Sequence, residues 1–125
     1  MFFIFNFSLL YADWASYIVI SELATRGDNG AVDEFVELYN PTSSTINISG
    51  WKLQTSPYNS ENWTTRQTIT GGPIQPYSYY LLANSAGYIS GNADEMNNWG
   101  GLSDTGGHVR IVNGADEQDR VGWGN

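Results

Sequence analysis

The sequence predicts an all-β domain built from about seven to nine short strands, arranged as a sandwich or a barrel. Three observations support this fold class. Short runs of β-branched and aromatic residues recur along the chain, Gly, Asn and Pro separate them, and no long window shows the apolar spacing of an amphipathic helix. The 125 residues fit one domain with its own core, and no disulfide contributes because the chain contains no Cys.

The first half of the domain is predicted to contain five strands, each bounded by turn residues. They cover residues 17–23, 34–40, 45–48, 50–54 and 66–69. A stretch rich in Gly and Asp, residues 26–30, forms the turn between the first two strands. Pro41 ends the second strand, because proline has no N–H to donate to a neighbouring strand.

Alternation within the second strand assigns its two faces. Val36 and Leu38 share one face, and Glu37 lies on the other. Glu37 is therefore expected to point outward, or to pair across strands with a basic side chain, Lys52 or Arg66.

The second half is predicted to contain three further strands around a long loop. The strands cover residues 77–82, 106–112 and 119–123, and the loop covers residues 83–103. Gly72, Pro73 and Pro76 punctuate the approach to the first of these strands. Asn113 and Gly114 form the kind of two-residue turn that joins β-hairpins. Within the loop, residues 93–97 could form a single helical turn.

Residues 1–16 are interpreted as a leader that precedes the domain, which covers residues 17–124. The apolar run ends near Ala12 and is too short to span a bilayer as a helix, which takes about 20 residues. It resembles the hydrophobic region of a secretory signal peptide, although no Lys or Arg precedes it. This favours an extracellular or cell-surface location without a stable membrane span. Alternatively, residues 3–9 alternate like a strand and would dock into the next copy of a self-assembling surface filament.

The charge balance argues against direct nucleic-acid binding. Thirteen Asp and Glu residues stand against five Lys and Arg residues, which gives a net charge of −8. Phosphate contacts need clustered basic side chains, and the sequence contains no such cluster. The acidity instead keeps the domain soluble and can attract divalent cations.

Six segments in a fixed order carry a family resemblance. They read IVISEL, DEFVELYNP, ISGWKLQ, IQPYSYYLL, LSDTGGHVRIV and DRVGWG. In this order and spacing, residues 17–124 resemble the lamin-tail domain in its bacterial and archaeal form. The stretch around Trp99, residues 98–100, is also similar to a tryptophan-glycine element of nuclear lamin tails. The resemblance implies an immunoglobulin-like β-sandwich.

The resemblance also implies a function without catalysis. The bacterial form is similar to mobile add-on modules of secreted or cell-surface proteins, often beside extracellular nucleases, phosphatases or other hydrolases. We therefore expect a binding, adhesion or spacer module that contacts a protein or a cell-surface polymer. It would act as a monomer or as part of a larger multidomain chain. The basic residues through which nuclear lamin tails contact chromatin have no clear counterpart in this sequence.

An acidic cluster forms the candidate metal site. Its members are Asp28, Asp33, Glu34 and Glu37, with Glu22 on the preceding strand. Carboxylates that converge from a loop and two adjacent strands could hold Ca²⁺ through oxygen ligands. The spacing does not match an EF-hand loop, and the same side chains could equally be solvated or ion-paired. No other cofactor is expected.

The aromatic side chains divide into core and loop positions. The core is expected to contain Trp51, Tyr80, and Phe35 or its neighbours on the same face of the strand. Three loop aromatics form the candidate ligand patch: Tyr58, Trp63 and Trp99. Exposed rings of this kind can stack on sugar rings or anchor a protein partner. Alternatively, they pack down onto the sandwich as lids.

No arrangement in the sequence predicts catalytic residues. His108 is the only histidine and is expected on the surface of a strand. Ser103 and Asp104 lie near it in sequence, but no nucleophile-elbow pattern surrounds them. Paired carboxylates for glycoside hydrolysis would also need a cleft, which so small a sandwich rarely provides. A small hydrolase is therefore only an alternative.

Overall fold

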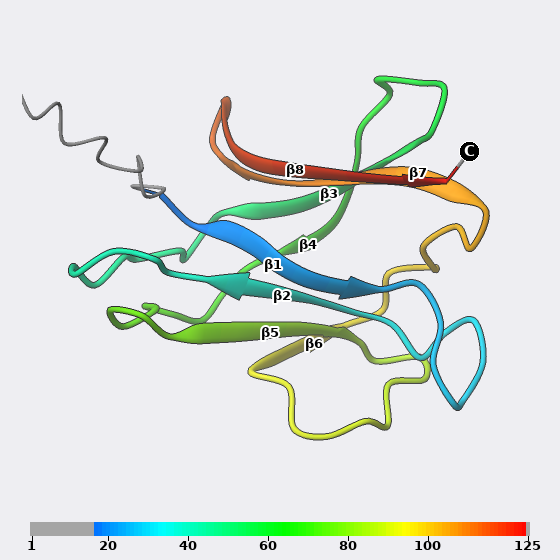
Figure 1. Ribbon diagram of the computed structural model, residues 1–125, viewed down its shortest axis with the longest axis horizontal. Helices are drawn as coiled ribbons and strands as arrows, with labels where there is room; N and C mark the ends of the chain where they lie inside the picture. The colour runs from blue at the N-terminus through cyan, green and yellow to red at the C-terminus, as the bar shows by residue number, and fades with distance from the viewer. Residues whose placement is uncertain (1–16, 125) are drawn as a thin grey trace, which may run out of the picture.

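The computed structural model describes residues 17–124, which form two β-sheets packed face to face (Figure 1). Eight strands make up the sheets, and none of the described residues is helical. The strands are β1 (Val19–Ala24), β2 (Phe35–Tyr39), β3 (Lys52–Pro57), β4 (Thr64–Thr68), β5 (Tyr79–Asn84), β6 (Glu95–Asn97), β7 (Gly106–Asn113) and β8 (Asp116–Gly124). The predicted all-β, immunoglobulin-like sandwich and its strand count are confirmed.

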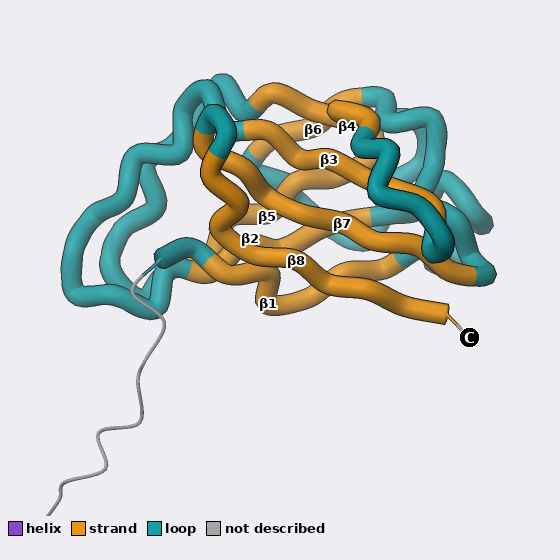
Figure 2. The backbone as a smooth tube through the Cα atoms, turned by 90° about the horizontal axis from the view of Figure 1, so that it is seen from above, coloured by secondary structure: helices purple, strands orange, loops and turns teal. Residues whose placement is uncertain are grey.

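Each sheet contains four strands. One sheet has the order β1-β2-β5-β6 and the other has the order β4-β3-β7-β8. All neighbouring strands are antiparallel except β5 and β6, which are parallel. Figure 2 shows the loops gathered at the two ends of the sandwich. Loops that a rigid sandwich holds in position are the usual place for ligand contacts.

The core lies between the sheets and follows the alternation of the strands. Val36 and Leu38 of β2 are fully buried, as their predicted face requires. Trp51 and Tyr80 are also buried, which confirms both as core residues. Phe35 is only half-buried, because it points away from the core while its neighbours point inward. The core is therefore built mainly from aliphatic residues, together with the rings of Trp51, Tyr80 and Trp99.

Side-chain hydrogen bonds join the two sheets along both edges. At one edge, the backbone N–H of Ile20 in β1 donates to Asp119 Oδ2 in β8 at 2.7 Å. At the other edge, Asn97 Nδ2 in β6 donates to the carbonyl oxygen of Arg66 in β4 at 2.9 Å. Such contacts cover backbone groups that an edge strand would otherwise offer to another chain.

Two segments differ in kind from the sequence prediction, and the ends of β1, β3, β4, β5 and β8 lie up to three residues from their predicted positions. Residues 93–97, expected to form a helical turn inside a loop, instead contain β6, so that prediction is wrong. Met96 is the single apolar residue of this short strand, which gives no alternation to detect. Residues 45–48 make only an isolated bridge between Ile46 and Ile74. The Asn40 amide donates to the carbonyl oxygens of Ser44 and Ile74, so side-chain bonds replace strand pairing there.

Glu95 of β6 ties the second edge to the loop after β4. Its carboxylate accepts the N–H groups of Thr70 at 2.9 Å and Gly71 at 3.1 Å, and the hydroxyl of Tyr80 at 3.1 Å. Burial alone would raise the pKa of Glu95, but the hydrogen bonds from Thr70 and Gly71 outweigh it and lower that pKa. Desolvation, and next the bond to Glu95, raise the pKa of Tyr80 to about 12.

We expect the free energy of unfolding to fall between about pH 10 and pH 12 because Tyr80 must then ionise beside Glu95. A folded-state pKa above the unfolded value contributes stability that is complete below the unfolded pKa. That stability is lost as the pH rises through the folded pKa. The loss due to Tyr80 should be on the order of 2 kcal/mol. Urea unfolding at several pH values measures it, and in Tyr80→Phe this share of the alkaline loss should vanish.

The predicted leader, residues 1–16, and the alternative docking strand, residues 3–9, lie outside the described residues. Within residues 17–124, no helix is long and apolar enough to cross a membrane.

Candidate functional site

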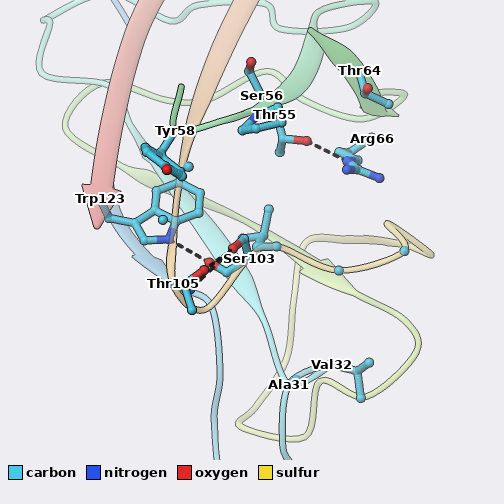
Figure 3. A pocket seen from close by; sticks show the side chains of 16 residues that line it. Ala31, Val32, Thr55, Ser56, Tyr58, Thr64, Arg66, Ser103, Thr105 and Trp123 are labelled. Carbon is cyan, nitrogen blue, oxygen red and sulfur yellow. Dashed lines mark hydrogen bonds between the residues drawn. The ribbon is translucent and has the colours of Figure 1, made fainter. Parts of the chain in front are cut away.

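A pocket of about 740 Å³ opens at one end of the sandwich (Figure 3). Its size lies within the usual range for small-ligand sites, about 300–1,000 Å³. It is lined by the end of β3, the start of β4, residues 100–103 and 105, the start of β7 and the end of β8. Ala31 and Val32, from the loop between β1 and β2, complete the lining. Strand ends of the β4-β3-β7-β8 sheet therefore meet the β1–β2 loop and the loop before β7 at one place.

Tyr58 and Trp123 form one wall of the pocket (Figure 3). The ring of Tyr58 is exposed, and the indole N–H of Trp123 donates to the carbonyl oxygen of Ser103 at 2.7 Å. Gly107 lets the indole lie close to β7, since a Cβ at this position would stand 3.1 Å from Trp123 Cζ2. A side chain on residue 107 would push the ring outward, so the glycine determines the shape of this wall.

Arg66 lies opposite the aromatic wall and is the one charged side chain among the lining residues (Figure 3). Its Nε donates to Thr55 Oγ1 at 2.6 Å, and its Nη1 donates to the carbonyl oxygen of Trp99 at 2.8 Å. A guanidinium has five N–H donors, so these two bonds fix its position and leave donors for a ligand.

Hydroxyl groups line the space between the two walls. The hydroxyls of Ser103 and Thr105 share a hydrogen bond of 3.2 Å, and Thr64 is exposed beside Arg66. Ser56 donates to the carbonyl oxygen of Ser60 at 2.7 Å, which fixes the loop that carries Tyr58. The pocket thus combines an apolar wall with polar groups that can orient a ligand.

A buried glutamate supports the loop at the base of the pocket. Glu34 is fully buried, and its carboxylate accepts the N–H of Leu102 and the Nδ2 of Asn84, the latter at 2.7 Å. Burial raises the pKa of Glu34, and these hydrogen bonds offset the effect only in part. The carboxylate of Glu34 therefore has a structural role, because its hydrogen bonds hold residues 100–102 in place.

A profile of the lamin-tail domain matches residues 14–125 of the chain. The chain belongs to the lamin-tail domain family. This family consists of immunoglobulin-like modules that are generally non-catalytic, as the resemblance implied. No curated protein sequence matches this lamin-tail domain.

The three aromatics of the predicted patch do not lie together in the lamin-tail domain. Trp99 is only 2% exposed, and its indole N–H donates to Gln67 Oε1 at 3.0 Å inside the core, so its place in the patch is wrong. Trp63 lies beneath the guanidinium of Arg110, 4.1 Å from the ring centroid, on the outer face of the second sheet. Only Tyr58 lines the pocket.

The acidic residues of the predicted calcium site do not lie together either. Within residues 17–124, no group of three or more His, Cys, Asp or Glu side chains could hold a metal ion. Asp33 is buried and accepts the N–H groups of Asn29 and Ile89, at 3.1 and 3.2 Å. Asp28 is exposed on the loop, and Glu37 faces away from the core. Asp28 and Asp33 lie in the loop before β2, and Glu37 lies on the outer face of that strand, so these carboxylates do not converge.

The prediction that Glu37 pairs with Lys52 or Arg66 is wrong. Lys52 and Arg66 belong to the other sheet, on the far side of the core. Glu37 instead accepts a hydrogen bond from the hydroxyl of Ser21 on β1 at 2.7 Å. Strand order cannot be read from the sequence pattern, and a cross-strand pair depends on it.

The residues of the alternative hydrolase are engaged with other groups. His108 Nε2 lies 3.0 Å from the carbonyl oxygen of Tyr58, to which it donates. Ser103 bonds to Thr105, and Asp104 pairs with Arg26 at 3.1 Å. None of these contacts joins the serine to the histidine, as nucleophilic catalysis would require.

Arg66 and Trp123 are the pocket residues that sequence reasoning missed. Both lie in predicted strands, where a side chain is first expected to serve the sheet. One signal was available, since Gly106 and Gly107 begin a strand and a strand with two glycines leaves room for a neighbouring ring.

Proposed function

We propose that this lamin-tail domain is a non-catalytic binding and adhesion module of a secreted or cell-surface protein, and that the pocket holds part of its ligand. The supporting observation is an aromatic wall, Tyr58 and Trp123, placed opposite Arg66, whose guanidinium retains donors. Beside an extracellular hydrolase or nuclease, such a module would keep the enzyme close to its polymer.

The chemistry of the pocket favours a sugar unit of a cell-surface polymer. A sugar ring offers a flat apolar face to Tyr58 and Trp123, and its hydroxyls can bond to Ser103 and Thr105. A carboxylate on the sugar would accept hydrogen bonds from Arg66. The chain carries a net charge of −8, so a densely charged polyanion would be repelled.

Sedimentation with insoluble polysaccharides tests the proposal. The full chain is mixed with cellulose, chitin or peptidoglycan, and galacturonic acid, a single sugar with one carboxylate, competes for binding. We expect retention on at least one polymer and about tenfold weaker binding for Arg66→Gln, which loses a charged hydrogen-bond donor. Lys52→Gln is the matched control, because it removes the same charge from an exposed site on β3, outside the pocket.

Equal binding by the wild type and Arg66→Gln would contradict the role of the pocket. Failure of every polymer to retain the wild type would contradict the sugar ligand. In that case we would expect the pocket, including Arg66, to bind part of a protein partner.

A further inference from the structure

The outer face of the β1-β2-β5-β6 sheet exposes aromatic rings. We call it the tyrosine face and define it by Phe35, Glu37, Tyr39, Tyr79 and Leu81, which alternate with core residues on β2 and β5. Tyr39 and Tyr79 are partners in the strand register, and their ring centroids lie 4.7 Å apart. Tyr79 is 59% exposed. Neighbouring exposed rings of this kind mark interaction surfaces.

Carboxylates cross the tyrosine face between its aromatic rings. Glu22 of β1 lies opposite Glu37 of β2 in the register, and Leu81 of β5 continues that row on the other side of Glu37. Asp94 lies at the far side, where its exposed carboxylate accepts the N–H of Leu81 at 2.7 Å. Like charges opposite one another destabilise a sheet, and a cationic partner would relieve this repulsion.

Basic side chains are confined to other parts of the domain. The strands β1, β2, β5 and β6 contain no Lys or Arg. Four of the five basic residues of the chain lie on the opposing sheet, and the fifth lies in a loop: Lys52, Arg66, Arg110, Arg120 and Arg26. The tyrosine face is therefore acidic and aromatic without internal charge compensation.

We propose that the tyrosine face docks a basic, extended segment of a partner protein. Lys or Arg side chains of the segment would pair with Glu22, Glu37 and Asp94 and stack on the exposed tyrosine rings. Strands lie about 4.8 Å apart, so the acidic row spans roughly 14 Å. Alternate side chains of an extended segment recur about every 7 Å, so three basic residues at alternate positions span the same length as this row.

This interaction goes beyond the proposed function. The pocket lies at the end of the sandwich, and no residue that defines the tyrosine face lines it. The two surfaces can therefore fail or succeed separately, and Arg66→Gln should leave binding at the tyrosine face unchanged.

Titration of the full chain with the peptide Ser-Lys-Ser-Lys-Ser-Lys-Ser, followed by NMR, tests the proposal. We expect backbone shifts at β1, β2 and β5, around Glu22, Glu37 and Tyr79. Glu37→Gln and Tyr79→Ser should each weaken binding at least fivefold. Both side chains lie on the outer face, and an unchanged melting temperature verifies that each variant folds. Asp116→Asn removes the same charge at the β7–β8 turn and should weaken binding less than twofold.

Three results would overturn the proposal. Equal weakening by Glu37→Gln and Asp116→Asn would mean that the overall negative charge of the domain, and not the tyrosine face, attracts the peptide. Shifts confined to the opposing sheet would place the peptide elsewhere. Shifts on the tyrosine face with cellohexaose, and none with the peptide, would make it a carbohydrate surface.

Discussion

Replacing Trp99 with Ala should lower the free energy of unfolding by about 3–5 kcal/mol, the range found when large aromatic side chains are removed from cores. Trp99 is almost completely buried, and its indole N–H is bonded to Gln67. Its removal leaves a cavity and a buried amide oxygen without a donor. For a domain of this size, the melting temperature should fall by roughly 10–20 °C. Urea and thermal unfolding measure both quantities.

Trp63→Ala is the matched control, because it removes the same side chain from the outer face. Trp63 contacts the guanidinium groups of Arg110 and Arg120, with ring-centroid distances of 4.1 and 4.8 Å. Cation–π contacts at such sites contribute about 0.5–1 kcal/mol each, so the loss should be far smaller than for Trp99. If the two variants lost equal stability, Trp99 would not be the core residue described above.

Replacing Glu34 with Ala should cost about 2–4 kcal/mol. The substitution leaves the N–H of Leu102 and the amide of Asn84 buried without their acceptor. It also frees the loop of residues 100–102 at the base of the pocket, so ligand binding and stability should fall together. Urea unfolding gives the first effect, and polysaccharide sedimentation gives the second.

Glu34→Gln distinguishes hydrogen bonding from charge. The amide keeps one carbonyl oxygen as acceptor, so we expect a loss smaller than that of the Ala variant. Asp28→Ala removes an exposed acidic side chain from the neighbouring loop and should change stability by less than about 0.5 kcal/mol. A neutral result for Glu34→Ala would mean that the buried carboxylate does not hold the loop.

The sequence predicted most of the fold because alternation and turn residues are local signals. The strands that became β2 and β7 were located within one residue at each end, since Pro41 and the Asn113-Gly114 turn mark their limits. β6 was missed because it has three residues and pairs with β5 through contacts distant in sequence. Its anchor, Glu95 bonded to Thr70 and Gly71, leaves no local pattern.

The candidate site was less predictable, because it depends on which strands become neighbours. Tyr58 is exposed and lines the pocket, but Trp99 is a core residue although it lies in a loop. Residue type and loop position gave the same expectation for both. Only the buried partner Gln67, contributed by a different strand, distinguishes them. Arg66 likewise could not be predicted as a pocket residue, because the pocket is assembled from strands and loops that are distant in sequence.

The edge contact between β1 and β8 has a mechanical consequence. Figure 1 shows these two strands lying in the same direction, so β1 enters the sandwich at one end and β8 leaves at the other. Tension applied at Val19 and Gly124 would pull the two strands past each other along their length. The bond from Ile20 to Asp119 and the strand pairs beside it would then bear the load in shear, and they would have to break together. Resistance to such a pull depends on the rate of unfolding, and it would suit a module that links two bodies under flow.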